Sequence, residues 1–273
     1  MTINCKGELI DFSTPKVMGI LNITPDSFYD GGYYTNQKEI LSQTEKMLEE
    51  GATFIDVGAY SSKPGAIHIS EQEELKRIIP AIKSILKEFP KAIISVDTFR
   101  SSVAKETVAN GAALINDISG GTLDEKMFET VAKLKVPYIL MHMKGTPQNM
   151  QKNPTYENII TELISFFANQ IYTLHELHVN DVVIDVGFGF GKTIEHNYQL
   201  LKDLALFKNL DVPILAGISR KSMLYKPLGI SPKEALNATT SANTIALLNG
   251  ANLLRVHDVK EAVQAINIVN LLN

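Results

Sequence analysis

The stretch VVIDVG, residues 182–187, is a run of β-branched residues with one carboxylate near its end and a glycine after it. Its apolar residues are nearly continuous instead of alternating with polar ones. That pattern is typical of a parallel strand covered on both faces. The run therefore predicts a buried parallel strand with a polar residue, Asp185, at its carboxyl end.

Seven further runs of the same kind predict seven more strands: VMGILN (17–22), FIDVG (54–58), IISVDT (93–98), ALINDIS (113–119), YILMHM (138–143), PILAGIS (213–219) and LLRVHD (253–258). Amphipathic helical patterns lie between them. Eight strands alternating with helices in 273 residues predict the α/β class and a single (β/α)8, or TIM, barrel spanning 1–273 as one domain. An open doubly wound sheet would also fit the alternation, but eight units favour closure.

One predicted helix, residues 71–89, contains Pro80, which should break or kink it. The predicted helix before it, 37–51, ends at a glycine, as does the one at 101–111. A further amphipathic pattern predicts one helix at 195–210.

Composition excludes several classes of protein. The formal net charge is −4, so no general basic field attracts nucleic acid or an anionic membrane, and an anionic substrate needs a local cluster of cations. The single cysteine, Cys5, cannot form a disulfide within the chain. No segment resembles a secretion signal, and no apolar run approaches the ~18 residues of a membrane span. A cytoplasmic protein is expected.

Polar residues gather where the predicted strands end. In a barrel of this type the reactive groups lie at the carboxyl ends of the strands and on the loops that follow. Helix capping or turn closure could account for one or two of them, Asp56 or Asp117 for example. It accounts less well for the whole set: Asn22, Asp56, Asp97, Asn116, Asp117, His142, Asp185, Ser219, Arg220, Lys221, Arg255 and His257.

The chemical types in this set indicate a ligand with two halves. Carboxylate and amide groups suit a flat, nitrogen-rich ring, because they pair with its N–H edge. Arg255, His257 and Arg220 are available for phosphate. Asn22 offers a hard oxygen ligand to Mg²⁺, which tolerates waters and substrate phosphates as its other ligands. A heterocycle that carries a diphosphate would satisfy both halves.

Three other motifs are weaker evidence for a function. GFGFGKT (187–193) ends like a phosphate-binding P-loop, but Val186 stands at the first glycine position and Lys192 at the third glycine of a dinucleotide fingerprint. HELH (175–178) is a helix-face histidine pair without a third metal ligand nearby. Lys221 could form a Schiff base, yet the surrounding groups for anions favour charge pairing.

A set of motifs in order along the chain resembles dihydropteroate synthase: MGILNITPDSFYDGG, SSKPGA, SVDTFR, INDISGG, MHMKGTPQNMQ, DVGFGFGKT, GISRKSM and RVHDV. The resemblance implies condensation of 6-hydroxymethyl-7,8-dihydropterin diphosphate with 4-aminobenzoate, which releases pyrophosphate and forms dihydropteroate in folate synthesis. It further implies Mg²⁺ as cofactor, small-molecule substrates as the partners, and a homodimer that binds neither nucleic acid nor membrane.

The resemblance also implies roles for individual residues. The pterin would be bound by Asp97, Asn116, Asp185, Lys221, Met141 and Gly217, and the diphosphate by Asn22, Ser62, Lys63, Arg255 and His257. The aminobenzoate site would comprise Phe28, Pro64, Phe190, Lys221 and Ser222, the metal ligand would be Asn22, and the residues of the chemistry would be Asp97, Lys221, Arg255 and His257.

In the family, TPDSF and SSKPGA belong to two mobile loops after the first and second strands, which close over the diphosphate. The second loop usually reads Ser-Thr-Arg-Pro-Gly, whereas this chain has Ser-Ser-Lys-Pro-Gly at 61–65, so Lys63 keeps the cation without the bidentate fork. Two alternatives share the pterin site: a methyltetrahydrofolate-dependent methyltransferase, against which the cations of SRK and RVH argue, and a pterin-binding protein without turnover.

Overall fold

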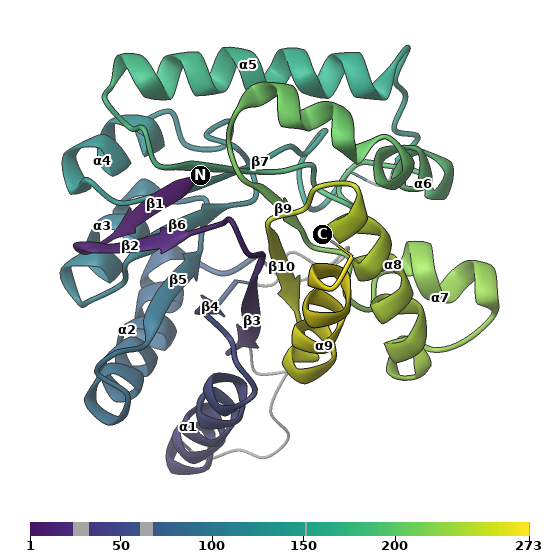
Figure 1. The fold of residues 1–273 in the computed structure, drawn as a ribbon. Coiled ribbons are helices and arrows are strands. Elements are labelled where there is room, and N and C mark those ends of the chain that lie inside the picture. The colour runs from purple at the N-terminus through teal and green to yellow at the C-terminus, as the bar shows by residue number, and fades with distance from the viewer. Residues whose placement is uncertain (24–32, 61–67, 151, 273) are drawn as a thin grey trace.

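The computed structural model describes residues 1–23, 33–60, 68–150 and 152–272. Eight parallel strands close into a barrel in the order β10-β3-β4-β5-β6-β7-β8-β9 (Figure 1). They are β3 (Lys16–Asn22), β4 (Phe54–Gly58), β5 (Ile93–Asp97), β6 (Leu114–Asp117), β7 (Tyr138–Met141), β8 (Val182–Asp185), β9 (Ile214–Ala216) and β10 (Leu253–Val256). Each coincides with a strand predicted from the sequence, and the (β/α)8 barrel is confirmed.

Helices surround the barrel because each buries one apolar stripe against the strands. They are α1 (Tyr33–Glu49), α2 (Glu71–Glu88), α3 (Ser101–Ala109), α4 (Met127–Leu134), α5 (Ile159–Glu176), α6 (Ile194–Lys202), α7 (Ser222–Leu228), α8 (Leu236–Leu248) and α9 (Val259–Asn270), with 3-10 helices η2 (Leu204–Leu210) and η3 (Pro232–Glu234). In the described part of the chain, none of them has the length and hydrophobicity that crossing a membrane requires.

Two predicted helix boundaries are wrong. α2 continues through Pro80 from Glu71 to Glu88, so the predicted break does not occur. A serine cap, Ser70, accepts a hydrogen bond from the Glu73 N–H, and Ile78, Ile82 and Ile85 are buried against the core. Packing of this face outweighs the local cost of the proline. The segment predicted as one helix at 195–210 is divided into α6 and η2.

An antiparallel hairpin precedes the barrel, and the sequence pattern did not indicate it. Its strands are β1 (Thr2–Cys5) and β2 (Glu8–Asp11), and it crosses one end of the barrel (Figure 1). Its inner face and Phe12 join a buried cluster with residues from the first half of the barrel strands, among them Met18, Phe54 and Leu253. The hairpin therefore covers the amino-terminal end of the barrel interior and leaves the carboxyl end as the open face.

Candidate active site

Side-chain alternation carries the predicted site residues to the barrel interior. The buried cluster at the amino-terminal end contains Leu114, Ile139, Val183, Leu215 and Leu253. Residues two positions further along a strand point to the same side. Those positions hold Asn116, Met141, Asp185, Gly217 and Arg255, and the same spacing continued from Met18 and Ile93 leads to Asn22 and Asp97. One apolar layer thus supports a polar layer directly above it.

Contacts across neighbouring strands bring these residues together. Asn22 of β3 pairs in register with Gly58 of β4, Gly58 with Asp97 of β5, and Asp97 with Asn116 of β6. A side-chain carbon added to Gly58 would lie 3.6 Å from Asn22 Oδ1 and 3.7 Å from Asp97 Oδ2. The amide and the carboxylate therefore flank the same backbone position at the open end of the barrel.

Arg255 is held by two carboxylates. Its Nε donates to Asp56 Oδ2 at 2.6 Å, and its Nη2 donates to Asp97 Oδ2 at 2.9 Å. Asp56 Oδ2 also accepts from Asn116 Nδ2 at 3.0 Å, and its Oδ1 accepts from Ser95 Oγ at 2.5 Å. Four strands thus meet in one network that fixes the guanidinium.

Asp56 belongs to the site, although the sequence alone allowed helix capping or turn closure as its role. It is fully buried and caps no helix; its partners are Arg255, Asn116 and Ser95. A signal was present: Asp56 lies two positions after Phe54, on the face that points into the barrel. For Asp117 the turn reading is right, because it binds the Ser119 and Gly121 N–H groups and the Tyr138 hydroxyl.

A second group of contacts joins the loops after β8 and β9. Asp185 Oδ1 accepts from the Gly187 N–H at 2.7 Å. Lys221 Nζ donates to the Phe188 carbonyl oxygen and lies 4.7 Å from the centre of the Phe190 ring. A side-chain carbon added to Gly217 would lie 3.5 Å from Asp185 Oδ2 and 3.9 Å from Lys221 Nζ, so these two charged groups share one corner of the site.

Burial changes the pKa of the charged groups here. It raises the pKa of Asp97 to about 7, against the opposing effect of Arg255, and it also raises the pKa of Asp185. It lowers the pKa of Lys221 to about 8, partly offset by Asp185. Burial opposes the charge of Arg255, but Asp56 and Asp97 outweigh it and raise its pKa. The site thus holds carboxylates and amines whose charges are costly without a ligand.

The remaining cations differ in their availability. His257 is exposed, and its Nδ1 lies 3.0 Å from Ser219 Oγ. Arg220, a sequence-based candidate for phosphate, instead donates to both Asp258 oxygens at 2.9 Å and to the carbonyl oxygens of Pro232 and Lys233. Its guanidinium is engaged in holding the loop after β9, so the phosphate prediction for Arg220 is wrong.

Several predicted residues cannot be compared with the structure. Phe28, Ser62, Lys63 and Pro64 lie outside the described residues. Ser222 is described; it is half-buried and begins α7, directly after Lys221.

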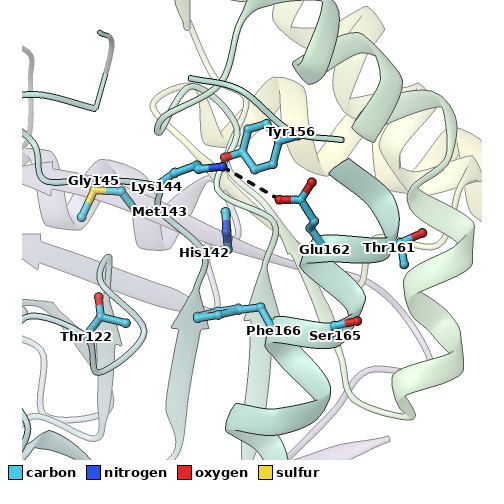
Figure 2. A pocket seen from close by; sticks show the side chains of 10 residues that line it. All are labelled: Thr122, His142, Met143, Lys144, Gly145, Tyr156, Thr161, Glu162, Ser165 and Phe166. Carbon is cyan, nitrogen blue, oxygen red and sulfur yellow. Dashed lines mark ion pairs between the residues drawn. The ribbon is translucent and has the colours of Figure 1, made fainter. Parts of the chain in front are cut away.

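A pocket of about 650 Å³ lies beside this site, between the loop after β7 and α5 (Figure 2). Its wall includes His142, Lys144, Tyr156, Glu162 and Phe166, and the Lys144 Nζ is 3.9 Å from a Glu162 oxygen. His142, one of the polar residues at the strand ends, lines it, but none of the residues to which the resemblance gives a role does. The polar layer inside the barrel, not this pocket, is therefore the candidate active site.

Comparison with known proteins agrees with this geometry. The model of the pterin binding enzymes matches residues 18–257. Dihydropteroate synthase of Escherichia coli K12 is 42% identical over 272 residues, which cover 98% of this chain and 95% of the relative. The chain belongs to the dihydropteroate synthase family. Members of this family are transferases of folate synthesis.

Solved structures of the family superpose on the whole chain. The Yersinia pestis dihydropteroate synthase in a sulfonamide drug complex has a TM-score of 0.92 and 42% identity, and the match covers 100% of this chain and 99% of that one. The Xanthomonas albilineans dihydropteroate synthase in complex with 7,8-dihydropteroate has a TM-score of 0.89 and 34% identity, with coverage of 100% and 98%.

Proposed function

We propose that this chain condenses 6-hydroxymethyl-7,8-dihydropterin diphosphate with 4-aminobenzoate, giving 7,8-dihydropteroate and pyrophosphate. The observation that carries the proposal is the polar layer at the open end of the barrel. There, Arg255 is hydrogen-bonded to the carboxylates of Asp56 and Asp97, and Asp56 also accepts from the Asn116 amide. It occurs in a chain that matches a dihydropteroate-bound family member over its full length.

The pterin ring is bound by the interior carboxylates. Asp185 and Asp97 accept hydrogen bonds from the ring's amino and N–H edge, and Asn116, fixed by Asp56, adds donor and acceptor atoms. Lys221 donates to the carbonyl side of the ring. Met141 and Gly217 leave apolar, flat space against the ring face. Pairing with the ring replaces the hydration that burial removes from these groups.

The diphosphate is bound at the rim, where Arg255 and His257 stabilise the charge that develops on the leaving group. Asn22 fits as the single protein ligand of Mg²⁺, because this ion keeps waters and substrate phosphates as its other ligands, and no cluster of three acidic, histidine or cysteine ligands is found among the described residues. When bound, the ion supplies further charge neutralisation of the diphosphate.

The reaction is a dissociative substitution at the pterin methylene carbon. The bond from this carbon to the diphosphate oxygen breaks, and the positive charge delocalises into the ring next to Asp97 and Asp185. The aromatic amine then forms the new C–N bond and loses a proton. Since the amine is already neutral near pH 7, no strong general base is required.

The second substrate lies against Phe190, Lys221 and Ser222, and the predicted contributions of Phe28, Pro64, Ser62 and Lys63 remain part of the proposal. Lys221 over the Phe190 ring presents a cation next to an aromatic face, which suits an aromatic carboxylate. Sulfonamides, one of which is bound in the Yersinia pestis structure, are expected to compete at this position.

The deciding experiment measures pyrophosphate release from the dihydropterin diphosphate with Mg²⁺, with and without 4-aminobenzoate. We expect release coupled to formation of dihydropteroate, and its loss on chelation of Mg²⁺. Pterin binding without condensation would instead support the methyltransferase or the non-catalytic reading.

The variant Asp185→Ala should bind no pterin, because the ring's donor edge loses its acceptor; normal pterin affinity would contradict the site assignment.

We also propose a homodimer. Exposed apolar side chains gather on α8, α9 and the residues that follow: Ile245, Leu248, Ile268, Leu271 and Leu272. α8 and α9 pack against each other, so these side chains are carried by neighbouring elements, and exposed apolar groups of this kind favour an interface. Light scattering coupled to size-exclusion chromatography should give twice the mass of the chain, and Ile268→Glu should reduce it to that of the monomer.

A further inference from the structure

Lys192 is a buried lysine to which the proposed mechanism gives no role. It follows the loop after β8 and is 3% exposed. Its Nζ lies 3.1 Å from His142 Nδ1, 3.2 Å from the His142 carbonyl oxygen and 3.0 Å from the Phe190 carbonyl oxygen. Burying an amine is costly without partners, and these three use its full hydrogen-bonding capacity.

The contacts are complete in either protonation state of Lys192. Burial lowers the pKa of His142 to about 2, so its ring is neutral. A charged Lys192 donates to Nδ1 and to both carbonyl oxygens. A neutral Lys192 donates to the two carbonyl oxygens and accepts from an Nδ1–H, since the neutral ring can carry its proton on either nitrogen. The lysine therefore joins the loop to the end of β7 over a wide pH range.

The joined loop, 186–191, lies directly on the chain that leaves β7. Gly187 and Gly191 have φ of +70° and +61°, and a side chain on them would collide with the carbonyl oxygens of His142 and Lys144. The Tyr156 hydroxyl donates to the Gly191 carbonyl oxygen at 2.8 Å. His142, Lys144 and Tyr156 lie together on the far side, around the pocket of Figure 2.

The other side of the same loop forms part of the candidate site. The Phe188 carbonyl oxygen accepts from Lys221, whose Nζ lies over the Phe190 ring. Lys192 holds the Phe190 carbonyl, so a shift of this residue's backbone moves both the ring and its contact with Lys221. Asp185, by contrast, is held by the pairing of β8 with β7 on one side and with β9 on the other.

We propose that Lys192 is a positioning residue for the second substrate: it sets the place of Phe190 and thereby the affinity for 4-aminobenzoate. The inference rests on the proposed function. Lys192 touches neither substrate; it acts through the loop, while Asp97, Asn116 and Asp185 lie on strands and keep their positions without it.

The test is steady-state kinetics of Lys192→Met, which keeps the length of the side chain and removes its polar contacts. We expect KM for 4-aminobenzoate to rise about tenfold, the size of effect that losing one buried hydrogen bond produces, with KM for the dihydropterin diphosphate within about twofold of wild type. Lys144→Met is the matched control, since it removes a neighbouring lysine whose side chain is half exposed. It should change neither KM by more than about twofold.

Tyr156→Phe provides a second, milder variant that removes a different hydrogen bond to the loop, the one to the Gly191 carbonyl oxygen. It should raise KM for 4-aminobenzoate by about threefold and leave KM for the dihydropterin diphosphate unchanged. Equal increases in both KM values, or a loss confined to kcat, would overturn the proposal, because a general structural defect does not select one substrate.

Failure of the proposed function is distinguishable from failure of this inference. The wild-type chain alone reports whether condensation occurs, whereas the ratio of variant to wild type reports on Lys192. If the wild type does not turn over, equilibrium binding of 4-aminobenzoate in the presence of the pterin gives the same comparison, with weaker binding expected for Lys192→Met and equal binding overturning the role.

Discussion

At the scale of single residues, the distribution of burial separates groups that act from groups that support. Asp56 is fully buried, whereas Asp97 keeps 13% of its side chain exposed. Both bind Arg255. The exposed partner can meet a ligand, and the buried one can only orient the guanidinium and Asn116. We infer that Asp56 stabilises the arrangement that the ligand meets.

The variant Asp56→Asn tests whether Asp56 holds Arg255 and Asn116 in place. The new amide keeps one acceptor oxygen for Arg255 and Asn116 but carries no charge, so the buried guanidinium loses one of its two carboxylate partners. Breaking a buried pair on one side costs about 3 kcal/mol of unfolding free energy, and urea denaturation measures it. Affinity for the dihydropterin diphosphate should fall as well.

Asp117→Asn is the matched control for Asp56→Asn, since Asp117 is equally buried and its partners are Tyr138, Ser119 and Gly121. It should lose stability and keep its affinity for the pterin substrate. Similar losses of affinity in the two variants would contradict a specific role for Asp56.

Lys192 also predicts a pH dependence of stability. Burial lowers its pKa from the ordinary 10.5 to about 7, so above pH 7 the unfolded chain binds more protons than the folded one. Its contribution to stability is therefore largest above pH 10.5 and is lost as the pH falls toward 7. The difference in unfolding free energy between wild type and Lys192→Met should grow from pH 7 to pH 10.

In this comparison the titration of Asp97, Asp185 and Lys221 cancels, because all three are present in both proteins, except for the coupling of Asp185 and Lys221 to Lys192. Urea denaturation of both proteins at three pH values measures the difference in unfolding free energy. A difference that stays constant would show that Lys192 has an ordinary pKa.

At the scale of elements, sequence patterns predicted all eight barrel strands because each is a nearly continuous apolar run, which few alternatives can accommodate. The hairpin of β1 and β2 escaped prediction because its strands have four residues each and bury alternate side chains only. Its short polar turn at Lys6 and Gly7 is a weak signal, and its stability derives from contact with the barrel, which a local pattern does not contain.

Pro80 is the clearest conflict between local preference and tertiary packing. It lies within α2 and is half-buried, next to the buried Ala81 and Ile82. Pro80→Ala restores a backbone donor and removes the clash with the preceding turn. The helix gains about 3 kcal/mol from the exchange and the more flexible unfolded chain takes back about 1 kcal/mol. We therefore expect the unfolding free energy, measured by urea denaturation, to rise by about 2 kcal/mol, with kinetic constants unchanged. A decrease would mean that the proline packs better than an alanine does.

At the scale of the molecule, the barrel separates stability from function along its axis. The hairpin and Phe12 cover one end, and the polar layer occupies the other. The candidate site could largely be predicted because strand ends converge in this fold. The structural roles of Arg220 and Asp56 depend on partners far away in sequence, Asp258 and Arg255 respectively, which no local pattern identifies.

Phe12→Ala tests this separation. Phe12 is 3% exposed within the cluster under the barrel, so truncation should lower the unfolding free energy by about 3 kcal/mol. Because the polar layer lies beyond the apolar one, KM for both substrates should stay within about twofold of wild type at a temperature where the variant is folded. A selective loss of substrate affinity would show that the two ends are coupled.

The network of Arg255 has a consequence for biosynthesis of the protein. Arg255 and Asp56 are 199 residues apart, and β10 pairs with β3 to complete the barrel. A nascent chain on the ribosome therefore carries β3 and β9 as open sheet edges, with Asp56 lacking its counter-charge, until the last strand has emerged. Catalytic competence arises in one late step, so a truncated translation product has no partial activity to contribute and is instead a substrate for chaperones and proteases.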